Sequence, residues 1–505
     1  MVALSLLVFM AAADEPPKPR VPLGKETTIV DGPLDKEGYV DFPAALNAKL
    51  GQGVTPQTNA NALLWQVFGP NPEGGKGLPD EFFKTLGIPR PPEDGDYFQD
   101  YEKYFKQHVV PPPMGEEWTP IHEMMAQATR QPWSAKDQPH LAAWLTANEK
   151  PLALVVEASK RPHYFNPLVP FATDNGPGML IGSLLPHVQK SRALGAALLY
   201  RAQLGIGEGR FDDAWQDLIA VHRLARHIGR GATLIEGLVG IALELIATRA
   251  DLSYLQHAPL TAAQLQARWK ELEALPPLVN MADKIDLGER FIFLDTVQNL
   301  ARGNGGGMVD GGIGGNWKLV NLGILMKTAN PWYDRMATAL RLQDRAKRTL
   351  ELKAIEHDAK VMNQKLHDGI VLNTLWAMMD EKLMAKQMGE RLIGLMLPAA
   401  LKVQEAADRS EQGLQTHRIA FALAASHHDT QVFPAKLDDL VPKYLVTVPG
   451  DNYSQKPLMY QRTETGYKLY SVGLNGKDDE GRNADDTPKG DDLVVVMPPA
   501  APKKP

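Results

Sequence analysis

The sequence contains no cysteine, which excludes disulfide bonds, thiolate metal sites, cysteine nucleophiles and a lipid anchor on an N-terminal cysteine. It also lacks an excess of positive charge, since the formal net charge of −6 provides no basic field to attract nucleic acid. Aromatic residues make up only 7% of the 505 residues and charged residues 23%. This is ordinary globular composition, and it excludes a wholly disordered or multi-span membrane protein.

Complete catalytic motifs are missing as well. His122 is followed by a glutamate but lacks the second histidine of a zinc-binding helix. Ser183 and Ser191 lie outside any Gly-x-Ser-x-Gly turn. His222 and His227 are five residues apart, which places them on different faces of one helix. Sequence motifs therefore assign no catalytic residue.

The N-terminus carries a short apolar run, residues 2–13, which is followed by Asp14 and Glu15. Twelve or so residues are too few to span a bilayer, which takes about twenty. The run suits a secretory signal peptide over residues 1–13 with cleavage after Ala13, although no lysine or arginine precedes it. We therefore expect an exported protein, periplasmic or extracellular, with no transmembrane span in the mature chain.

Composition and periodicity predict a mainly α protein, with a body of helical bundles or hairpins and a small C-terminal α+β module. Helical periodicity dominates from residue 119, and the turn before Ala214 resembles that of a tetratricopeptide hairpin, without a second copy. The expected segments are a Pro/Gly-rich region with short helices (14–118), a helical domain (119–300), a Gly-rich linker (301–316), long helices (317–390), the module (391–497) and a Pro/Lys tail (498–505).

Aromatic residues gather near residue 100 at helical spacing: Tyr97, Phe98, Tyr101, Tyr104 and Phe105. The spacing favours a helix face that packs on a core. The alternative is an aromatic strip that binds carbohydrate or peptide.

The C-terminal module gives the clearest pattern. Periodicity predicts a long helix over 383–428 and a short helix over 435–441. A hairpin follows, with strands at 458–462 and 467–472 that turn at Thr465-Gly466, and the last strand is expected at 493–497.

Several short motifs recur in a fixed order along this module: the helix with Pro398, Ala406-Ala407-Asp408-Arg409, Phe433-Pro434, Tyr460, Tyr470-Ser471-Val472-Gly473, Asn475-Gly476 and Asp491-Asp492-Leu493. This order resembles the C-terminal part of the major (G-type) pseudopilin of type II secretion systems. The whole chain is also similar to large exported bacterial proteins with such a tail, which implies no activity. The chain departs from pseudopilins where a charged segment, residues 379–392, replaces their apolar half-helix.

The loop at 475–492 holds seven carboxylates against three basic side chains. In the G-type family this loop binds Ca²⁺, and the resemblance places Asn475 at the first ligand position and Asp492 at the last. Gly490 occupies the position of an intermediate aspartate, so another acid must substitute. Flexible loops rich in oxygen ligands suit calcium. The candidate ligands are Asn475, Asp478, Asp479, Asp485, Asp491 and Asp492, with Asp486 as a further substitute; the alternative is a solvated acidic loop.

The sequence favours a non-enzymatic interaction or structural protein of the cell envelope, with protein partners and with Ca²⁺ as the candidate ion. Two alternatives remain open. One is an extracytoplasmic hydrolase whose site would be a cleft between the Pro-rich region and the helices. The other is an accessory component related to type II secretion.

Overall fold

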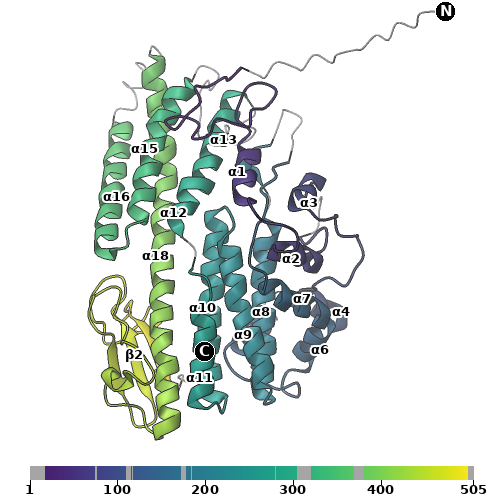
Figure 1. Ribbon diagram of the computed structural model, residues 1–505, viewed down its shortest axis with the longest axis vertical. Coiled ribbons are helices and arrows are strands. Elements are labelled where there is room, and N and C mark those ends of the chain that lie inside the picture. Colours follow the sequence, from purple (N-terminus) through teal and green to yellow (C-terminus); the bar gives the residue numbers. More distant parts are fainter. Residues whose placement is uncertain are drawn as a thin grey trace, which may run out of the picture.

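The computed structural model describes residues 18–498, except 74–76, 110–114, 116–117, 172–177, 184, 279, 304–319 and 369–379. It confirms a mainly α protein with a small C-terminal sheet (Figure 1). The expected signal peptide and most of the Gly-rich linker lie outside the described residues. Over the described ranges, no helix combines the length and the apolar character that a membrane span requires.

The helices of the body are α1 (Phe42–Leu50), α2 (Ala60–Phe68), α3 (Asp80–Leu86), α4 (Tyr101–His108), α5 (Trp118–Ala128), α6 (Pro139–Ala147), α7 (Glu149–Ser159), α8 (Pro186–Gly207), α9 (Phe211–Gly229), α10 (Leu234–His257), α11 (Ala262–Glu273), α12 (Met281–Asp283), the π-helical η3 (Lys284–Glu289), α13 (Arg290–Ala301), α15 (Leu322–Leu340) and α16 (Arg345–Asp368). A short 3-10 turn, η2, covers Leu180–Gly182. Helix starts follow local chemistry: the side chains of Thr233 and Thr261 form capping boxes at the starts of α10 and α11.

Helices α8 and α9 form the hairpin that the sequence predicts, and Ala214 of α9 packs against Gly205 of α8. Helix α10 then packs along both of them (Figure 1). The short helices α2, α4, α6 and α7 cover the outer side of this three-helix group. Their shared apolar cluster, here called the body core, includes the fully buried Trp65, Trp215 and Leu198. This core is the largest in the molecule's described part.

A second cluster, here called the upper core, lies among α1, α13, α15, α16 and η3. It contains Phe42 from the Pro/Gly-rich region, Phe291 from the segment before the linker and Tyr333 from the segment after it. The rings of Phe42 and Phe291 meet edge to face with 5.6 Å between their centroids. Residues from three of the segments expected from sequence therefore share one hydrophobic core.

The long helix α18 (Glu381–Thr430) runs the full height of the molecule (Figure 1). Ile393 in its first half lies in the upper core and Phe421 lies in the body core. Ile419 and Leu423, near its end, belong to a third cluster, here called the module core. One helix therefore joins all three cores.

The C-terminal module consists of the end of α18, the 3-10 helix η5 (Leu437–Leu440) and the strands β1 (Met459–Arg462), β2 (Tyr467–Ser471) and β3 (Leu493–Met497). The strands form one antiparallel sheet in the order β1-β2-β3. Strand and helix positions agree with the sequence expectation to within a few residues. Alternation explains the success, since Tyr467 and Leu469 point into the module core beside α18.

Candidate functional site

The acidic loop connects β2 to β3 and folds back on itself, so that residues 490–492 lie against residues 479–482. Gly490 makes this approach possible. A Cβ atom at that position would lie 2.3 Å from the carbonyl oxygen of Arg482 and 2.8 Å from Cβ of Asp479. A side chain therefore has no room at position 490.

Three of the predicted ligands come together in this loop. One carboxylate oxygen from each of Asp479, Asp491 and Asp492 lies within 4.8 Å of the other two. Asp492 is only 1% exposed, whereas Asp479 and Asp491 are half-buried. We call these three residues the acidic triad.

Backbone and amide donors hold the acidic triad in place. The backbone N–H of Asn475 donates to Asp491 Oδ2 (2.8 Å), and the side-chain amide of Asn475 donates to Asp479 Oδ2 (3.2 Å). The N–H of Gly481 donates to Asp492 Oδ2 (2.7 Å). The other oxygens, Oδ1 of Asp491 and Oδ1 of Asp492, are buried and have no hydrogen-bond partner among the described residues. Buried carboxylate oxygens usually have partners, so these two are available to a cation.

The electrostatics of the acidic triad also suit a cation. Burial raises the pKa of Asp492, and the negative charges of Asp479 and Asp478 raise it further. Hydrogen bonds from the Asp491 backbone and from Asn475 lower the pKa of Asp479, which keeps that carboxylate charged. The nearby guanidinium of Arg482 pairs with Glu480 (3.0 Å). A hard divalent cation with oxygen ligands would relieve the repulsion between the three carboxylates.

Three of the six predicted ligands, Asn475, Asp478 and Asp485, lie outside the acidic triad. The carboxylate of Asp478 accepts hydrogen bonds from the Tyr470 hydroxyl (3.2 Å) and from the Glu480 backbone (2.8 Å). Asp485 is exposed, and its backbone N–H donates to the side chain of Asn483 (2.8 Å). Asn475 supports the acidic triad through its two nitrogen donors. Its side-chain oxygen accepts from Lys477.

A different set of ionisable groups lies deep between α9, α10 and α18. His222 Nδ1 bonds to Glu244 Oε2 and His222 Nε2 bonds to Asp251 Oδ2, each at 3.0 Å. Asp251 Oδ2 also bonds to Nε2 of His417 (3.1 Å), and Arg226 pairs with Glu244. We call this row of five residues the charge chain.

The charge chain is buried, and its protonation follows from its neighbours. Burial alone would lower the pKa of His222, but Glu244 and Asp251 outweigh it and raise the pKa to about 9. Burial would likewise raise the pKa of Glu244, but His222 and Arg226 lower it. His222 and Asp251 are both fully buried. Because each nitrogen of His222 already contacts a different carboxylate, the charge chain is a structural network and offers no open position for substrate.

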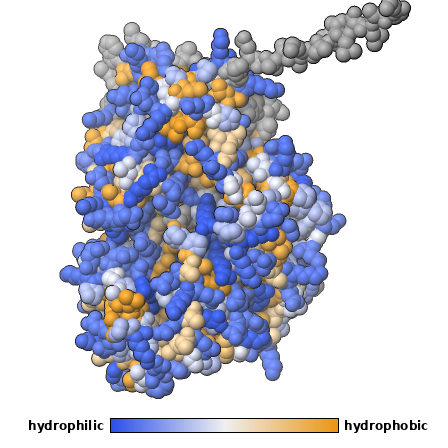
Figure 2. All heavy atoms as spheres, in the orientation of Figure 1, coloured by the Kyte–Doolittle hydropathy of each residue, from blue (hydrophilic) through white to orange (hydrophobic). Residues whose placement is uncertain are grey.

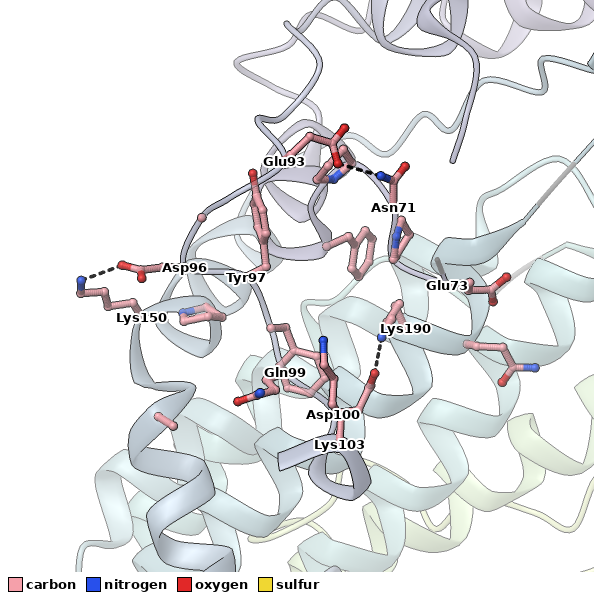
Figure 3. A pocket seen from close by; sticks show the side chains of 18 of the residues that line it. Asn71, Glu73, Glu93, Asp96, Tyr97, Gln99, Asp100, Lys103, Lys150 and Lys190 are labelled. Carbon is pink, nitrogen blue, oxygen red and sulfur yellow. Dashed lines mark hydrogen bonds and ion pairs between the residues drawn. The ribbon is translucent and has the colours of Figure 1, made fainter. Parts of the chain in front are cut away.

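A groove of about 1050 Å³ lies between the Pro/Gly-rich region and α4, α7 and α8. This is where the hydrolase alternative would place a cleft. Three of its five carboxylates have partners (Figure 3): Asp96 pairs with Lys150 (2.8 Å), Asp100 pairs with Lys190, and Glu93 accepts from Asn71 (2.9 Å). The other two that line the groove are Glu73 and Glu149. Lys150 lowers the pKa of Asp96, which keeps this acid charged rather than available as a proton donor.

The aromatic residues near this groove divide into two groups. Phe98 and Tyr101 are buried and pack against Trp144, with ring centroids 5.8 and 5.4 Å away, so the core interpretation is confirmed for them. Tyr97 lines the groove beside the occupied carboxylates (Figure 3). Tyr104 and Phe105 are half-buried and pack against the body core, so four of the five rings belong to that core.

Sequence reasoning missed the charge chain, although a signal was present. Helix α10 is apolar apart from a few positions, yet Glu236, Glu244 and Asp251 recur at intervals of eight and seven residues. This spacing places all three acids on one helix face. All three are buried in the structure.

Comparisons of the chain with family models, curated proteins and solved structures find no match.

Proposed function

We propose that this chain is an exported, non-enzymatic interaction or structural protein whose C-terminal module binds Ca²⁺ at Asp479, Asp491 and Asp492. The single observation that carries the proposal is the pair of buried, unpartnered oxygens, Oδ1 of Asp491 and Oδ1 of Asp492, within one acidic triad. Calcium coordinates six to eight oxygens, so main-chain carbonyls and water would complete the shell.

The surface next to the acidic triad suits a protein partner. Figure 2 shows a mostly hydrophilic face with small hydrophobic patches, one of them over the C-terminal module. The exposed apolar side chains of the module include Met459 (41%), Leu474 (44%) and Val496 (40%). Leu474 immediately precedes Asn475, which is bonded to two members of the acidic triad. Calcium would therefore fix the position of Leu474 and make partner binding dependent on the ion.

The hydrolase alternative receives less support. Three of the five carboxylates that line the groove between the Pro/Gly-rich region and the helices already pair with lysines or an amide. A hydrolytic acid–base pair would need one carboxyl group with a raised pKa near a second free one. A role as an accessory of type II secretion rests on the resemblance of the module alone. The first half of α18, which would pack a filament, instead packs against α15 and α16.

Calcium titration of the full chain after removal of metal with a chelator tests the proposal. We expect one saturable Ca²⁺ site by calorimetry, with much weaker binding of Mg²⁺, which prefers a smaller octahedral site. For a dissociation constant of about 10 μM, 1 mM Ca²⁺ would stabilise the fold by roughly 2.7 kcal/mol. The substitution Asp492→Asn removes one anionic ligand and should weaken binding by about tenfold or more, at least about 1.4 kcal/mol.

Asp485→Asn is the matched control, because it removes a carboxylate from the same loop but outside the acidic triad. Its affinity for calcium should equal that of the native chain to within about twofold, since distant surface charges contribute little. Equal weakening by both substitutions would show that calcium only screens a solvated acidic loop, and would overturn the proposal. So would the absence of saturable binding at millimolar calcium.

A further inference from the structure

A small basic pocket lies where the end of α7, the second half of α9 and the segment after α11 meet. It has a volume of about 230 Å³. Its ionisable lining consists of Lys160, Arg161, Arg223, Arg226, Arg230 and His227. The other described lining residues are uncharged, so no acid faces the cavity from the described part of the chain.

Only part of this positive charge is neutralised nearby. Arg226 pairs with Glu244 of the charge chain, and Lys160 pairs with Glu157 (3.4 Å). Arg223 forms no ion pair or hydrogen bond with any residue that the structure describes.

Two further arginines bond to carbonyl oxygens alone. Arg161 Nη1 donates to the carbonyls of Pro56 (2.6 Å) and Asn59 (2.9 Å). Arg230 Nη1 donates to the carbonyl of Pro162 (3.0 Å). These bonds position both guanidinium groups without cancelling their charge. The carboxylate of Glu157 acts on Arg161 as well as on Lys160, so Arg223 and Arg230 are the cations of this cavity without a counter-charge among the described residues.

The protonation state of His227 reflects both its burial and the positive charge around the cavity. It is only 5% exposed, and its Nε2 bonds to the carbonyl of Ser159 at 3.0 Å, so Nε2 carries the proton. Burial lowers the pKa of His227 to about 4, and the positive charges of Arg230 and Arg223 contribute although the Ser159 carbonyl opposes the shift. Its Nδ1 is buried and has no hydrogen-bond partner among the described residues. Burial is thus the main cause of the neutral imidazole, and the charges of the two arginines act in the same direction.

We propose that this pocket binds a tetrahedral oxyanion of the size of phosphate, held by Arg161, Arg223 and Arg230. Guanidinium groups present paired donors that match phosphate oxygens. Three arginines around the cavity, two of them without a counter-charge, favour a dianion over a monocarboxylate. The volume of 230 Å³ is below the range of about 300–1,000 Å³ that drug-sized ligands occupy, and so selects a small anion or a single phosphate group. The site is independent of the acidic triad and of the proposed calcium binding.

Calorimetric titration of the full chain tests this site, with inorganic phosphate, sulfate, O-phosphoserine and acetate compared at constant ionic strength. We expect saturable one-to-one binding of phosphate and sulfate and at least about tenfold weaker binding of acetate. O-phosphoserine distinguishes two sources of the same chemistry: binding equal to phosphate indicates an esterified phosphate as ligand, and its exclusion indicates the free anion. Either result supports the pocket.

Two substitutions locate the site. Arg223→Gln and Arg230→Gln, at partly exposed and exposed positions, should each weaken phosphate binding by about tenfold, or about 1.4 kcal/mol. Arg391→Gln, an exposed arginine on α18 outside the pocket, is the control and should leave it unchanged. Nuclear magnetic resonance of His227 adds a second measurement, because a bound anion should raise its pKa from about 4.

Three results would overturn the proposal: no saturable phosphate binding at about 10 mM, equal weakening by all three substitutions, or an unchanged pKa of His227 under saturating phosphate. Because Arg230 is exposed, Arg230→Gln keeps the test valid if Arg223→Gln disturbs folding.

Discussion

Two histidines on α9 acquire opposite properties from their surroundings. His222 lies between the carboxylates of Glu244 and Asp251, which raise its pKa to about 9 in spite of burial. His227, five positions later, lies among arginines and is buried, and its pKa falls to about 4. Their separation on different helix faces was predicted from spacing. The partners of His222 were not predicted, because Asp251 and His417 lie 29 and 195 residues after it in the sequence, on other helices.

At the residue scale, replacement of His222 tests the charge chain. His222→Leu leaves two buried carboxylates without their shared cation, and the free energy of unfolding should fall by about 3–5 kcal/mol. Urea unfolding of the full chain measures the change. His357→Leu, at an exposed histidine of α16, should change stability by less than about 0.5 kcal/mol. A loss of similar size in both variants would contradict a structural role for the charge chain.

The charge chain also predicts how stability depends on pH. The pKa of His222 is raised from 6.5 to about 9 in the folded chain, so the folded state binds its proton more tightly than the unfolded state. This contribution is fully present below pH 6.5 and is lost as the pH rises through about 9. The stability difference between the native chain and His222→Leu should therefore shrink from pH 6.5 to pH 9.5. A stability difference between the two chains that grows over this pH range would contradict a raised pKa of His222 in the folded state.

The acidic triad shows the limit of site prediction at this scale. Six candidate ligands followed from the loop composition and the family resemblance, and the fold brings three of them together with Asn475 in support. Which acids converge depends on the backbone reversal at Gly490. Spacing along an irregular loop does not reveal such a reversal, whereas spacing along a helix or strand does.

At the element scale, the contact of α9 with α10 depends on close backbone approach. A Cβ atom at Gly240 would lie 2.6 Å from the carbonyl oxygen of Ala225 and 2.8 Å from Cα of Gly229. Gly240→Ala should therefore destabilise the chain by about 1–3 kcal/mol, because backbone atoms cannot move aside as a side chain can.

The matched control is Gly413→Ala in α18, where nothing lies within 4 Å of the added Cβ. There only the helix propensity changes, and stability should rise by up to about 1 kcal/mol. Chemical denaturation measures whether the free energy of unfolding falls in Gly240→Ala and rises in Gly413→Ala. Stabilisation by both substitutions would show that α9 and α10 lie farther apart than the structure places them.

Elements with strong local signals were predictable. The alternation in β2 and the period of α18 located both from sequence. Which elements share a hydrophobic core was harder to predict from the sequence. Phe42 and Phe291 meet across 249 positions of sequence, and no local pattern specifies that contact.

At the scale of the whole molecule, α18 should make the three cores unfold together. All nine tryptophans precede α18, and Trp215 and Trp269 contact Phe421 of α18, so their fluorescence reports on the body and its contact with α18 and not on the strands of the module. Leu469→Ala creates a cavity in the module core and costs about 2–5 kcal/mol. We expect it to lower the midpoint of unfolding detected by tryptophan fluorescence, although the substitution lies in the module.

Val446→Ala provides the comparison, because Val446 belongs to the same module but is 78% exposed. It should leave the midpoint unchanged. If Leu469→Ala left the midpoint of the tryptophan transition unchanged and circular dichroism showed a separate transition at lower denaturant, the module would unfold on its own.

The position of α18 in the chain also has a consequence for biosynthesis. The ribosome makes residues 381–430 after three quarters of the chain, yet these residues supply Ala385, Leu392, Ile393 and Val403 to the upper core and the helical wall of the module core. The nascent chain cannot close either core until this helix has emerged. Newly made protein therefore passes through a long interval with open apolar surface, during which chaperones or a translocation machinery can hold it unfolded.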